Sequence, residues 1–194
     1  MGSLSLQATT RSYILRIMVI KETAQLGNKV IRTKAKKVQE PTSKAVQKTV
    51  RDLIDSMRDK DLVGMAAPQI GKSERIFVTE VRETKYRNRK NKRKADPLRV
   101  FINPKITSFS QKEEKGFEGC GSVLSAGLFG EVQRSATIEV DAFDEKGERF
   151  SLKAKGLLAR IIQHEMDHIN GVVFVDKANP KTFIGTKEYL LAQK

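Results

Sequence analysis

The chain has 194 residues, of which 37 are Lys or Arg and 23 are Asp or Glu, so its formal net charge is +14. This length suits one domain with an adequate core, and the single cysteine excludes an internal disulfide framework. No run of about 20 apolar residues is present to span a bilayer. The surplus of positive charge favours a polyanionic neighbour such as nucleic acid, a ribosome or an anionic membrane surface.

Residues 1–17 differ in composition from the rest of the chain. They contain two arginines, five Ser or Thr residues and no acidic residue, which fits a leader, an upstream start or a transit-peptide-like segment. We expect this stretch to lie outside the fold and the folded domain to cover residues 18–194. A cytoplasmic location is expected, or an organellar one if the stretch is the remnant of a transit peptide.

Residues 43–60 predict the first helix. Thr42 or Ser43 can cap its N-terminus. Its apolar residues recur at helical spacing and form one stripe that we expect in the core, namely Val46, Val50, Leu53, Ile54 and Met57.

The middle of the chain predicts strands. Residues 63–71 are expected to form a loop that leads into a strand at 75–81, and a second strand is expected around 99–106. Residues 116–125 are also expected to be extended. The segment between the first two strands, 85–94, has seven basic residues in ten, and we expect a solvated loop there.

The last third of the chain predicts a hairpin and a second helix. Residues 135–143 alternate in hydropathy, a turn follows at 144–147, and residues 148–154 return as a partner strand. A helix is expected over 156–170, ending near Gly171. The whole pattern predicts an α+β fold, a single domain of mainly antiparallel strands packed around a central metal-binding helix.

Both histidines of the chain lie in one pentapeptide, His164-Glu165-Met166-Asp167-His168. This is an H-E-x-x-H motif, and residues four apart share a helix face, so both imidazoles can reach one metal ion. The glutamate of such a motif commonly serves as the general base for a metal-activated water. Two surface histidines on a polar helix are the simpler alternative, which the apolar surroundings disfavour.

A third protein ligand is expected, because catalytic zinc-type sites use three and keep one position open. Phe174 occupies the place of the last histidine in the longer H-E-x-x-H-x-x-G-x-x-H pattern. Glu188 follows His168 by 20 residues, as in another ligand class, but only six residues come after it, and chain ends fray. Cys120 remains, since a thiolate binds zinc or ferrous iron well. The alternative is that this cysteine is a small buried apolar residue. The glycines on both sides of Cys120 make that interpretation weaker.

Three blocks of the chain resemble the signature of the peptide deformylases. The first, G-φ-G-φ-A-A-x-Q-φ, is similar to residues 63–71, with the family's first glycine falling at Leu62-Val63. The second, E-G-C-L-S, is similar to residues 118–122, where Gly121 replaces the usual leucine. The third, Q-H-E-x-D-H, is similar to residues 163–168. The blocks occur in the family's order, and the resemblance extends from about residue 18 to residue 176.

The resemblance implies hydrolytic removal of the formyl group from the N-terminal methionine of newly made polypeptides. It implies a divalent metal on Cys120, His164 and His168, with ferrous iron as the native ion and zinc, nickel or cobalt as substitutes. Glu165 is then the catalytic acid–base group. Gln69 and the backbone N–H of Gly121 stabilise the oxyanion.

The resemblance also implies a substrate-binding set. It comprises Val63 and Gly64, which pair with the peptide backbone, Leu157 and Ile161, which line the methionine pocket, and Glu118 of the second block. We expect Arg160 to extend outward, with its stem on the rim of this pocket. The implied partners are N-formylmethionyl peptides and, by charge, the ribosome with its nascent chain and RNA; no membrane partner is expected.

Two other functions remain open from the sequence. One is a related hydrolase for a different N-acylated peptide. The other is a basic RNA- or ribosome-binding module in which the metal is only structural. An intact Glu165 and Gln69 favour an enzyme, because a structural metal site needs neither.

Overall fold

The computed structural model describes residues 18–86 and 95–192, and its elements confirm the expected α+β class. The helices are α1 (Lys44–Asp59), α2 (Gly156–Ile169) and α3 (Thr186–Leu191). The strands are β1 (Gly64–Ala66), β2 (Ile76–Val81), β3 (Asp96–Phe109), β4 (Glu113–Gly119), β5 (Leu128–Ser135), β6 (Thr137–Phe143), β7 (Arg149–Lys155) and β8 (Ile184–Gly185). The expected leader at 1–17 and most of the basic run, 87–94, lie outside the described residues.

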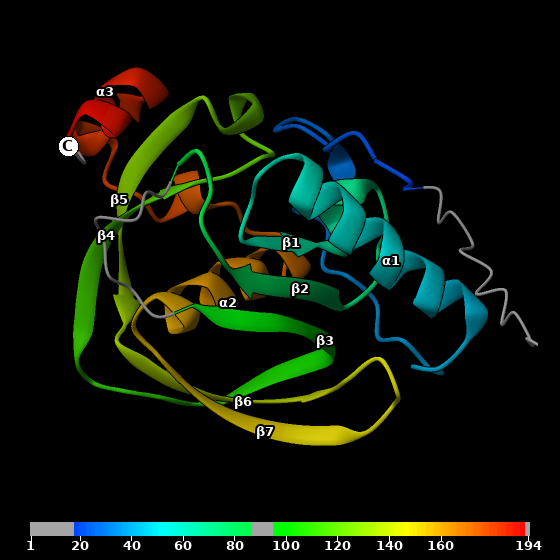
Figure 1. Cartoon of the computed structure of the whole chain (residues 1–194). Coiled ribbons are helices and arrows are strands. Elements are labelled where there is room, and N and C mark those ends of the chain that lie inside the picture. The colour runs from blue at the N-terminus through cyan, green and yellow to red at the C-terminus, as the bar shows by residue number, and fades with distance from the viewer. Residues whose placement is uncertain (1–17, 87–94, 193–194) are drawn as a thin grey trace, which may run out of the picture.

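The strands form two antiparallel sheets (Figure 1). The larger has the order β1-β2-β3-β6-β7 and the smaller the order β4-β5-β8. Within the described chain, β1 and β4 each pair with a strand on one side only, so each sheet presents an edge. An edge strand offers unpaired backbone N–H and C=O groups to an added strand.

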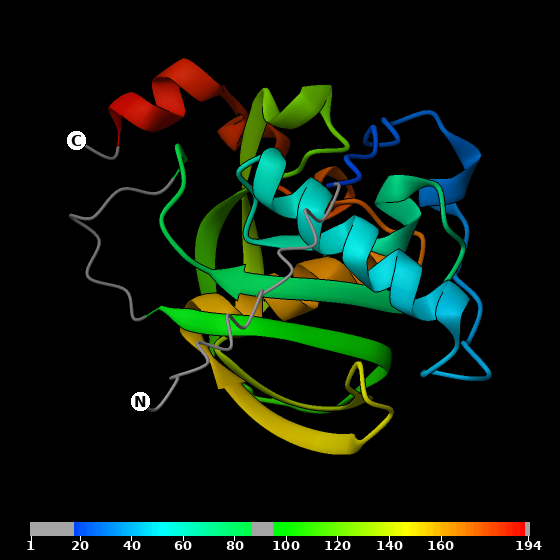
Figure 2. The same cartoon turned by 45° about the vertical axis from the view of Figure 1, so that its right-hand side comes forward.

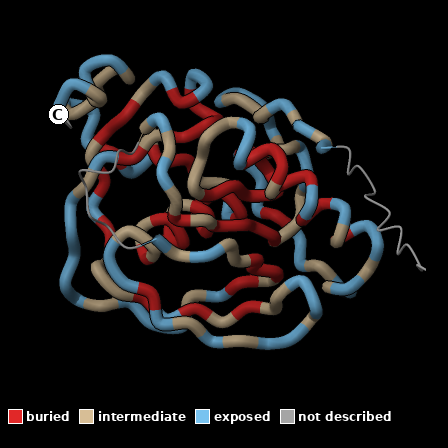
Figure 3. The backbone as a smooth tube through the Cα atoms, viewed as in Figure 1, coloured by how far each residue is buried: buried red, intermediate tan, exposed pale blue. Residues whose placement is uncertain are grey.

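Helix α2 lies at the centre of the molecule, and Figure 2 shows it behind β2 of the larger sheet. Its apolar face packs on that sheet through residues with little or no exposed surface: Ala159, Ile162, Met166, Ile169, Phe77, Phe101, Ile138 and Val140. Figure 3 shows buried backbone concentrated along this helix and the strands around it. No helix in residues 18–86 and 95–192 is long and apolar enough to cross a membrane.

Helix α1 covers the other face of β1 and β2, as its apolar stripe predicts. Ser43 caps the helix by accepting a hydrogen bond from the N–H of Val46. Val46, Val50, Leu53 and Met57 are buried against the strands, while Ile54 is partly buried at the edge of the same cluster. Strands β1 and β2 are therefore enclosed between α1 and α2, which holds the first motif block close to the second helix.

The structure corrects several expected boundaries. Residues 64–66 of the first block form β1 rather than a loop, because they pair with β2. The extended stretch expected at 116–125 ends at Gly119, where the chain turns back and the N–H groups of Val123 and Ala126 both bond to the Cys120 carbonyl. Strand β3 is longer than expected, and β5, β8 and α3 were not predicted.

The C-terminus of α2 is closed by a glycine in a left-handed conformation. Gly171 has φ +79°, its N–H bonds to the His168 carbonyl, and the N–H of Val172 bonds to the Asp167 carbonyl. These two bonds form a Schellman motif, which satisfies carbonyls that the helix leaves unpaired. The motif therefore ends the helix at Ile169, one residue after His168.

Replacing Gly171 with alanine is expected to destabilise the protein for two reasons. The left-handed backbone costs an L-residue about 1–2 kcal/mol, and a Cβ at this position would lie 2.8 Å from the carbonyl oxygen of Arg32. Gly71→Ala is the matched control, because its φ is +78° and its Cβ would meet no atom within 4 Å. Chemical denaturation should give a clearly larger loss for Gly171→Ala, and equal losses would contradict this account.

Candidate metal centre and substrate cavity

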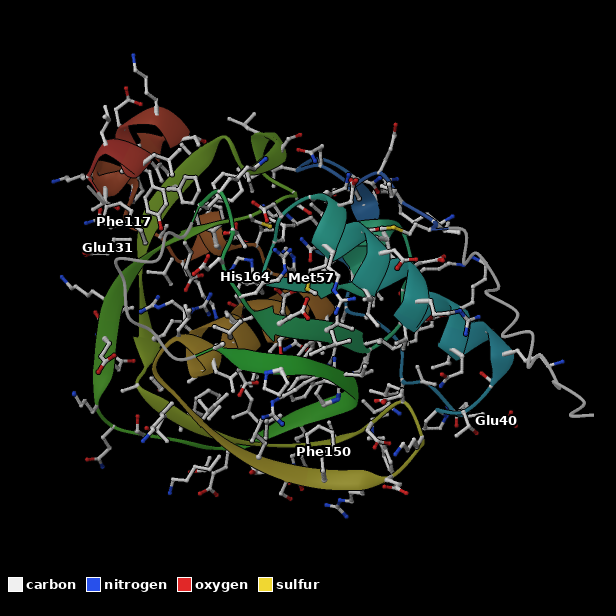
Figure 4. The ribbon with its side chains drawn as sticks, in the orientation of Figure 1. Glu40, Met57, Phe117, Glu131, Phe150 and His164 are labelled. Carbon is white, nitrogen blue, oxygen red and sulfur yellow. The ribbon has the colours of Figure 1, made fainter. Side chains whose placement is uncertain are left out.

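Helix α2 brings the two histidines and the glutamate of the H-E-x-x-H motif to one face. Glu165 and His168 are buried, and the side chain of His164 is 12% exposed. Figure 4 shows His164 in the interior of the molecule. The position of β1 depends on Gly64, because a Cβ there would lie 2.4 Å from Oε1 of Glu165 and 2.9 Å from Cγ2 of Ile161. A glycine is therefore required where the first block crosses the motif helix.

Cys120 reaches this face from the turn after β4. Its Sγ lies 3.1 Å from Nε2 of His168, and ligand atoms of Cys120, His164 and His168 all lie within 4.8 Å of one another. The expected three side chains are thus brought together, although the cysteine and the nearer histidine are 44 positions apart in the sequence. Glu188, the alternative third ligand, lies on α3 and is not in this group.

The chemistry of the three side chains fits a divalent metal. Nδ1 of His164 lies 2.9 Å from Oε2 of Glu118, so an Nδ1–H that donates there leaves Nε2 as the ligand atom. Burial would raise the pKa of Cys120, but the charges of His168 and His164 and their hydrogen bonds lower it well below its ordinary value. The surroundings of the cysteine therefore favour the thiolate, which is the form that binds metal.

Glu118 has a different environment from the one expected of a substrate-binding residue. Its carboxylate accepts two hydrogen bonds from Arg134 at 3.0 and 2.9 Å and one from Arg160 at 2.8 Å, besides its contact with His164. Burial would raise the pKa of Glu118, but the hydrogen bonds from His164 and Arg134 hold it far below its ordinary range. The carboxylate is occupied by protein donors, so it orients His164.

Arg160 turns inward, which corrects the expectation that it extends outward. Its side chain is 14% exposed and, besides Glu118, it donates to the carbonyls of Gly116, Val132 and Glu114. The guanidinium fits because position 116 is a glycine, at which a Cβ would lie 3.1 Å from Cζ of Arg160. Glu118 and three backbone carbonyls of β4 and β5 thus provide the acceptors that solvent would otherwise supply.

Glu165 contrasts with Glu118 because its carboxylate is not fully satisfied. Its Oε2 is buried and has no hydrogen-bond partner among the described residues. Burial raises the pKa of Glu165 to about 7 in the chain without a metal. A buried carboxylate oxygen with no partner in the described chain, beside three side chains that could hold a metal ion, is suited to accept a proton from a bound water.

Gln69 and Gly121 lie beside Cys120. Oε1 of Gln69 accepts from the N–H of Ala66 at 2.8 Å, while its Nε2 makes only long contacts, 3.6 Å to Sγ of Cys120 and 3.5 Å to Oγ of Ser122. The N–H of Gly121 bonds to no acceptor in the described part of the chain. Both groups are therefore available as donors at the cavity that they line.

The two departures from the deformylase signature lie close together in the fold. Leu62 stands at the family's first glycine and Gly121 at its leucine, and a Cβ on Gly121 would lie 3.1 Å from Cδ1 of Leu62. The leucine side chain therefore fills space beside position 121 from the neighbouring segment.

The site opens into a cavity of about 930 Å³ between the edge of β1 and the edge of β4. Its walls include the backbone segment Val63–Gly64 on one side and Leu157 and Ile161 of α2 on another, as expected of the binding set. Cavities of this size accommodate small peptides and drug-sized ligands.

Sequence reasoning missed the residues that support this site from behind. Arg134 bridges Glu118 to Asp167, and Lys177 also bonds to Asp167 at 2.6 Å. Gln25 donates to the carbonyl of Gly121 at 2.8 Å and accepts from the N–H of Ser125. The only feature of the sequence that could have indicated a role for Arg134 was a basic residue within a stretch of alternating hydropathy. No feature of the sequence indicated a role for Gln25.

Comparison with known proteins gives one family. A family model described as polypeptide deformylase matches residues 20–183. A peptide deformylase of Dictyoglomus thermophilum is 38% identical over 164 residues, which cover 84% of this chain and 96% of that protein. One from Natranaerobius thermophilus is 35% identical over 161 residues, covering 83% and 94%.

Solved structures agree with the sequence comparisons. The class I type b peptide deformylase of Acinetobacter baumannii with Met-Ala-Ser bound aligns with a TM-score of 0.75 at 29% identity, covering 82% of this chain and 99% of that one. The peptide deformylase of Thermotoga maritima aligns with a TM-score of 0.70 at 33% identity, covering 83% and 99%.

Removing the charge of Arg134 is expected to destabilise the fold strongly. The side chain is 4% exposed, and Arg134→Met would leave the buried carboxylates of Glu118 and Asp167 without their shared cation, which typically costs about 3–5 kcal/mol. The matched control is Arg149→Met, because Arg149 is 71% exposed and pairs with Asp141 at the surface. Urea unfolding that gave both variants the same small loss would contradict the role assigned to Arg134.

Proposed function

The chain belongs to the polypeptide deformylase family, and we propose that it hydrolyses the formyl group from the N-terminal methionine of newly made polypeptides in the cavity beside α2. The observation that carries the proposal is the meeting of a cysteine, two histidines and a buried carboxylate oxygen that has no partner among the described residues. Cys120, His164 and Glu165 of this group line one cavity. A purely structural metal site would need no free carboxylate beside it.

Cys120, His164 and His168 are the residues proposed to hold the metal. When bound there, a divalent ion acts as a Lewis acid and lowers the pKa of a ligated water towards about 7. Peptide deformylases are metal-dependent enzymes, and one thiolate with two imidazoles suits both ferrous iron and zinc. We infer ferrous iron as the native ion from the family resemblance, with zinc, nickel or cobalt as substitutes.

Glu165 moves the proton in this scheme. Its Oε2 accepts a proton from the attacking water and passes it to the amine nitrogen as the bond from that nitrogen to the formyl carbon breaks. The products are formate and the polypeptide, whose N-terminal methionine now carries a free amine. Gln69, through Nε2, and Gly121, through its N–H, donate to the carbonyl oxygen as it gains negative charge. Support comes from the described part of the chain, where Nε2 of Gln69 makes only long contacts and the N–H of Gly121 meets no acceptor.

The substrate binds as an added strand. The edges of β1 and β4 both border the cavity, and an extended peptide between them can bond to backbone groups of Val63, Gly64 and the β4 edge. The methionine side chain then lies toward α2, against Leu157 and Ile161. The side chain of Glu118 serves His164, so we assign it no direct contact with the peptide.

Glu165→Ala is expected to lower turnover of formyl-methionyl peptides by about 10²–10⁴-fold, the usual contribution of a general acid–base group. Metal content should stay near one ion per chain, because Glu165 is outside the proposed ligand set. Formate release and elemental analysis of anaerobically purified protein measure the two effects.

Cys120→Ala is the companion variant and should lose most of its metal as well as its activity. Stoichiometric, tightly held metal in Cys120→Ala would remove the cysteine from the ligand set. Wild-type turnover in Glu165→Ala would refute the hydrolytic scheme. Zinc as the only ion in anaerobically purified wild type would contradict the assignment of iron.

We also propose that the positive charge of the chain brings it to the ribosome, where nascent formylated chains emerge. Neutralising Lys90, Lys92, Arg93 and Lys94, which lie outside the described residues, should weaken association with ribosomes, most visibly at low salt. Turnover of a short formyl peptide should change little, because the run lies outside all three motif blocks.

A second quadruple variant separates local charge from net charge. Lys29, Lys34, Lys37 and Lys44 are exposed and lie on another part of the chain, and neutralising them removes the same four charges. Equal weakening in both variants would assign the effect to net charge alone. Unchanged ribosome binding by the first variant across salt concentrations would refute the role of the basic run.

A further inference from the structure

Four aromatic side chains gather at the outer end of the cavity, and we call them the aromatic rim: Tyr86, Phe117, Phe129 and Tyr189. They come from the segment after β2, from β4, from β5 and from α3. Phe129 stacks on Tyr189 with ring centroids 3.9 Å apart, and its centroid lies 5.7 Å from that of Tyr86. Phe117 lies 6.0 Å from Tyr189. The chain has nine Phe, three Tyr and no Trp, so a third of its aromatic residues meet here.

All four rings line the same cavity as Cys120 and His164. Phe117 remains 41% exposed, and Figure 4 shows it beside α3, away from His164. The contact between Tyr86 and Phe129 joins the two sides of the cleft, since Tyr86 follows β2 of the larger sheet and Phe129 lies in the smaller one. The rim is therefore part of the substrate cavity rather than a separate surface cluster.

The side chains of β4 point alternately to two faces of the strand, one toward α2 and one toward the aromatic rim. Glu118 points toward α2, where it bonds to His164 and Arg160, and the guanidinium of Arg160 lies over Gly116. The alternate residues point the other way. Phe117 contacts Tyr189, and the ring of Phe129 packs onto Gly119, where a Cβ would lie 2.5 Å from it.

An extended peptide beside β4 must follow the same alternation, because successive side chains of a strand point to opposite faces. The proposed function places the first side chain, methionine, on the α2 face. We propose that the aromatic rim is a binding subsite for the side chain of the second residue of the substrate, and that it selects apolar and aromatic side chains there. This inference rests on the proposed function, which supplies the direction of the peptide.

The chemistry of the rim supports an apolar occupant. Stacked and tilted rings offer faces and edges to another ring or to an aliphatic chain. The second side chain would also cover the exposed part of Phe117. A small or strongly polar side chain would leave this surface exposed to water or place a polar group against it.

The test measures kcat/KM for formyl-Met-X-Ser peptides in which X is Phe, Leu, Ala or Asn. Formate release is the readout of turnover. Phe and Leu should exceed Ala by roughly 3- to 10-fold, the range expected of one aromatic contact, and Asn should not exceed Ala. Values within twofold for all four peptides would overturn the inference while leaving the proposed function intact. No formate from any peptide would overturn the proposed function and the subsite together.

Two variants of the aromatic rim and one control variant test whether the preference at the second residue depends on the rim. Tyr189→Ala and Tyr86→Ala should each bring the ratio of Phe to Ala peptides toward one. Phe109→Ala should keep the wild-type ratio, because Phe109 is 57% exposed at the end of β3 and does not line the cavity. If Tyr189→Ala does not fold because α3 loses its docking ring, Tyr86→Ala decides. A folded Tyr86→Ala with the wild-type ratio would then overturn the inference.

Discussion

The carboxylate of Glu118 is the group on which the geometry of the centre depends. It is buried and joins three elements, because it contacts His164 on α2 and Arg134 on β5 while belonging to β4. A charge in this environment is tolerated only when donors surround it. The arginines hold the Glu118 carboxylate in place, and its contact with Nδ1 sets the ring orientation of His164, one proposed metal ligand. The histidine is positioned by an ion-pair network as well as by its helix.

That network continues away from the cavity. Arg134 forms ion pairs with both Glu118 and Asp167. Asp167 is also paired with Lys177, which lies beyond the end of α2. The network therefore ties the motif helix to the smaller sheet and to the segment that follows the helix. Polar groups that are buried and mutually satisfied permit few alternative arrangements. A hydrolytic centre needs this rigidity, because its donors and its acid–base group must already be in place when the substrate arrives.

Local patterns of the sequence predicted the local structure well. The stripe of α1, the hairpin of β6 and β7, and the face shared by His164 and His168 all follow from periodicities of a few residues. Strand β5 was missed because Gly130 and the buried Arg134 interrupt its apolar alternation. The inward turn of Arg160 was also missed, since it depends on Gly116, a residue 44 positions away that contacts it only in the folded chain. The role of Glu118 likewise depends on pairings that no local pattern contains.

The closeness of Leu62 to Gly121 bears on how sequences in this family can change. A side chain introduced at position 121 would place its Cβ 3.1 Å from Cδ1 of Leu62, so the leucine side chain would have to shift to admit it. The space available to a side chain at position 121 therefore depends on the residue at position 62. The two positions are expected to vary together across relatives.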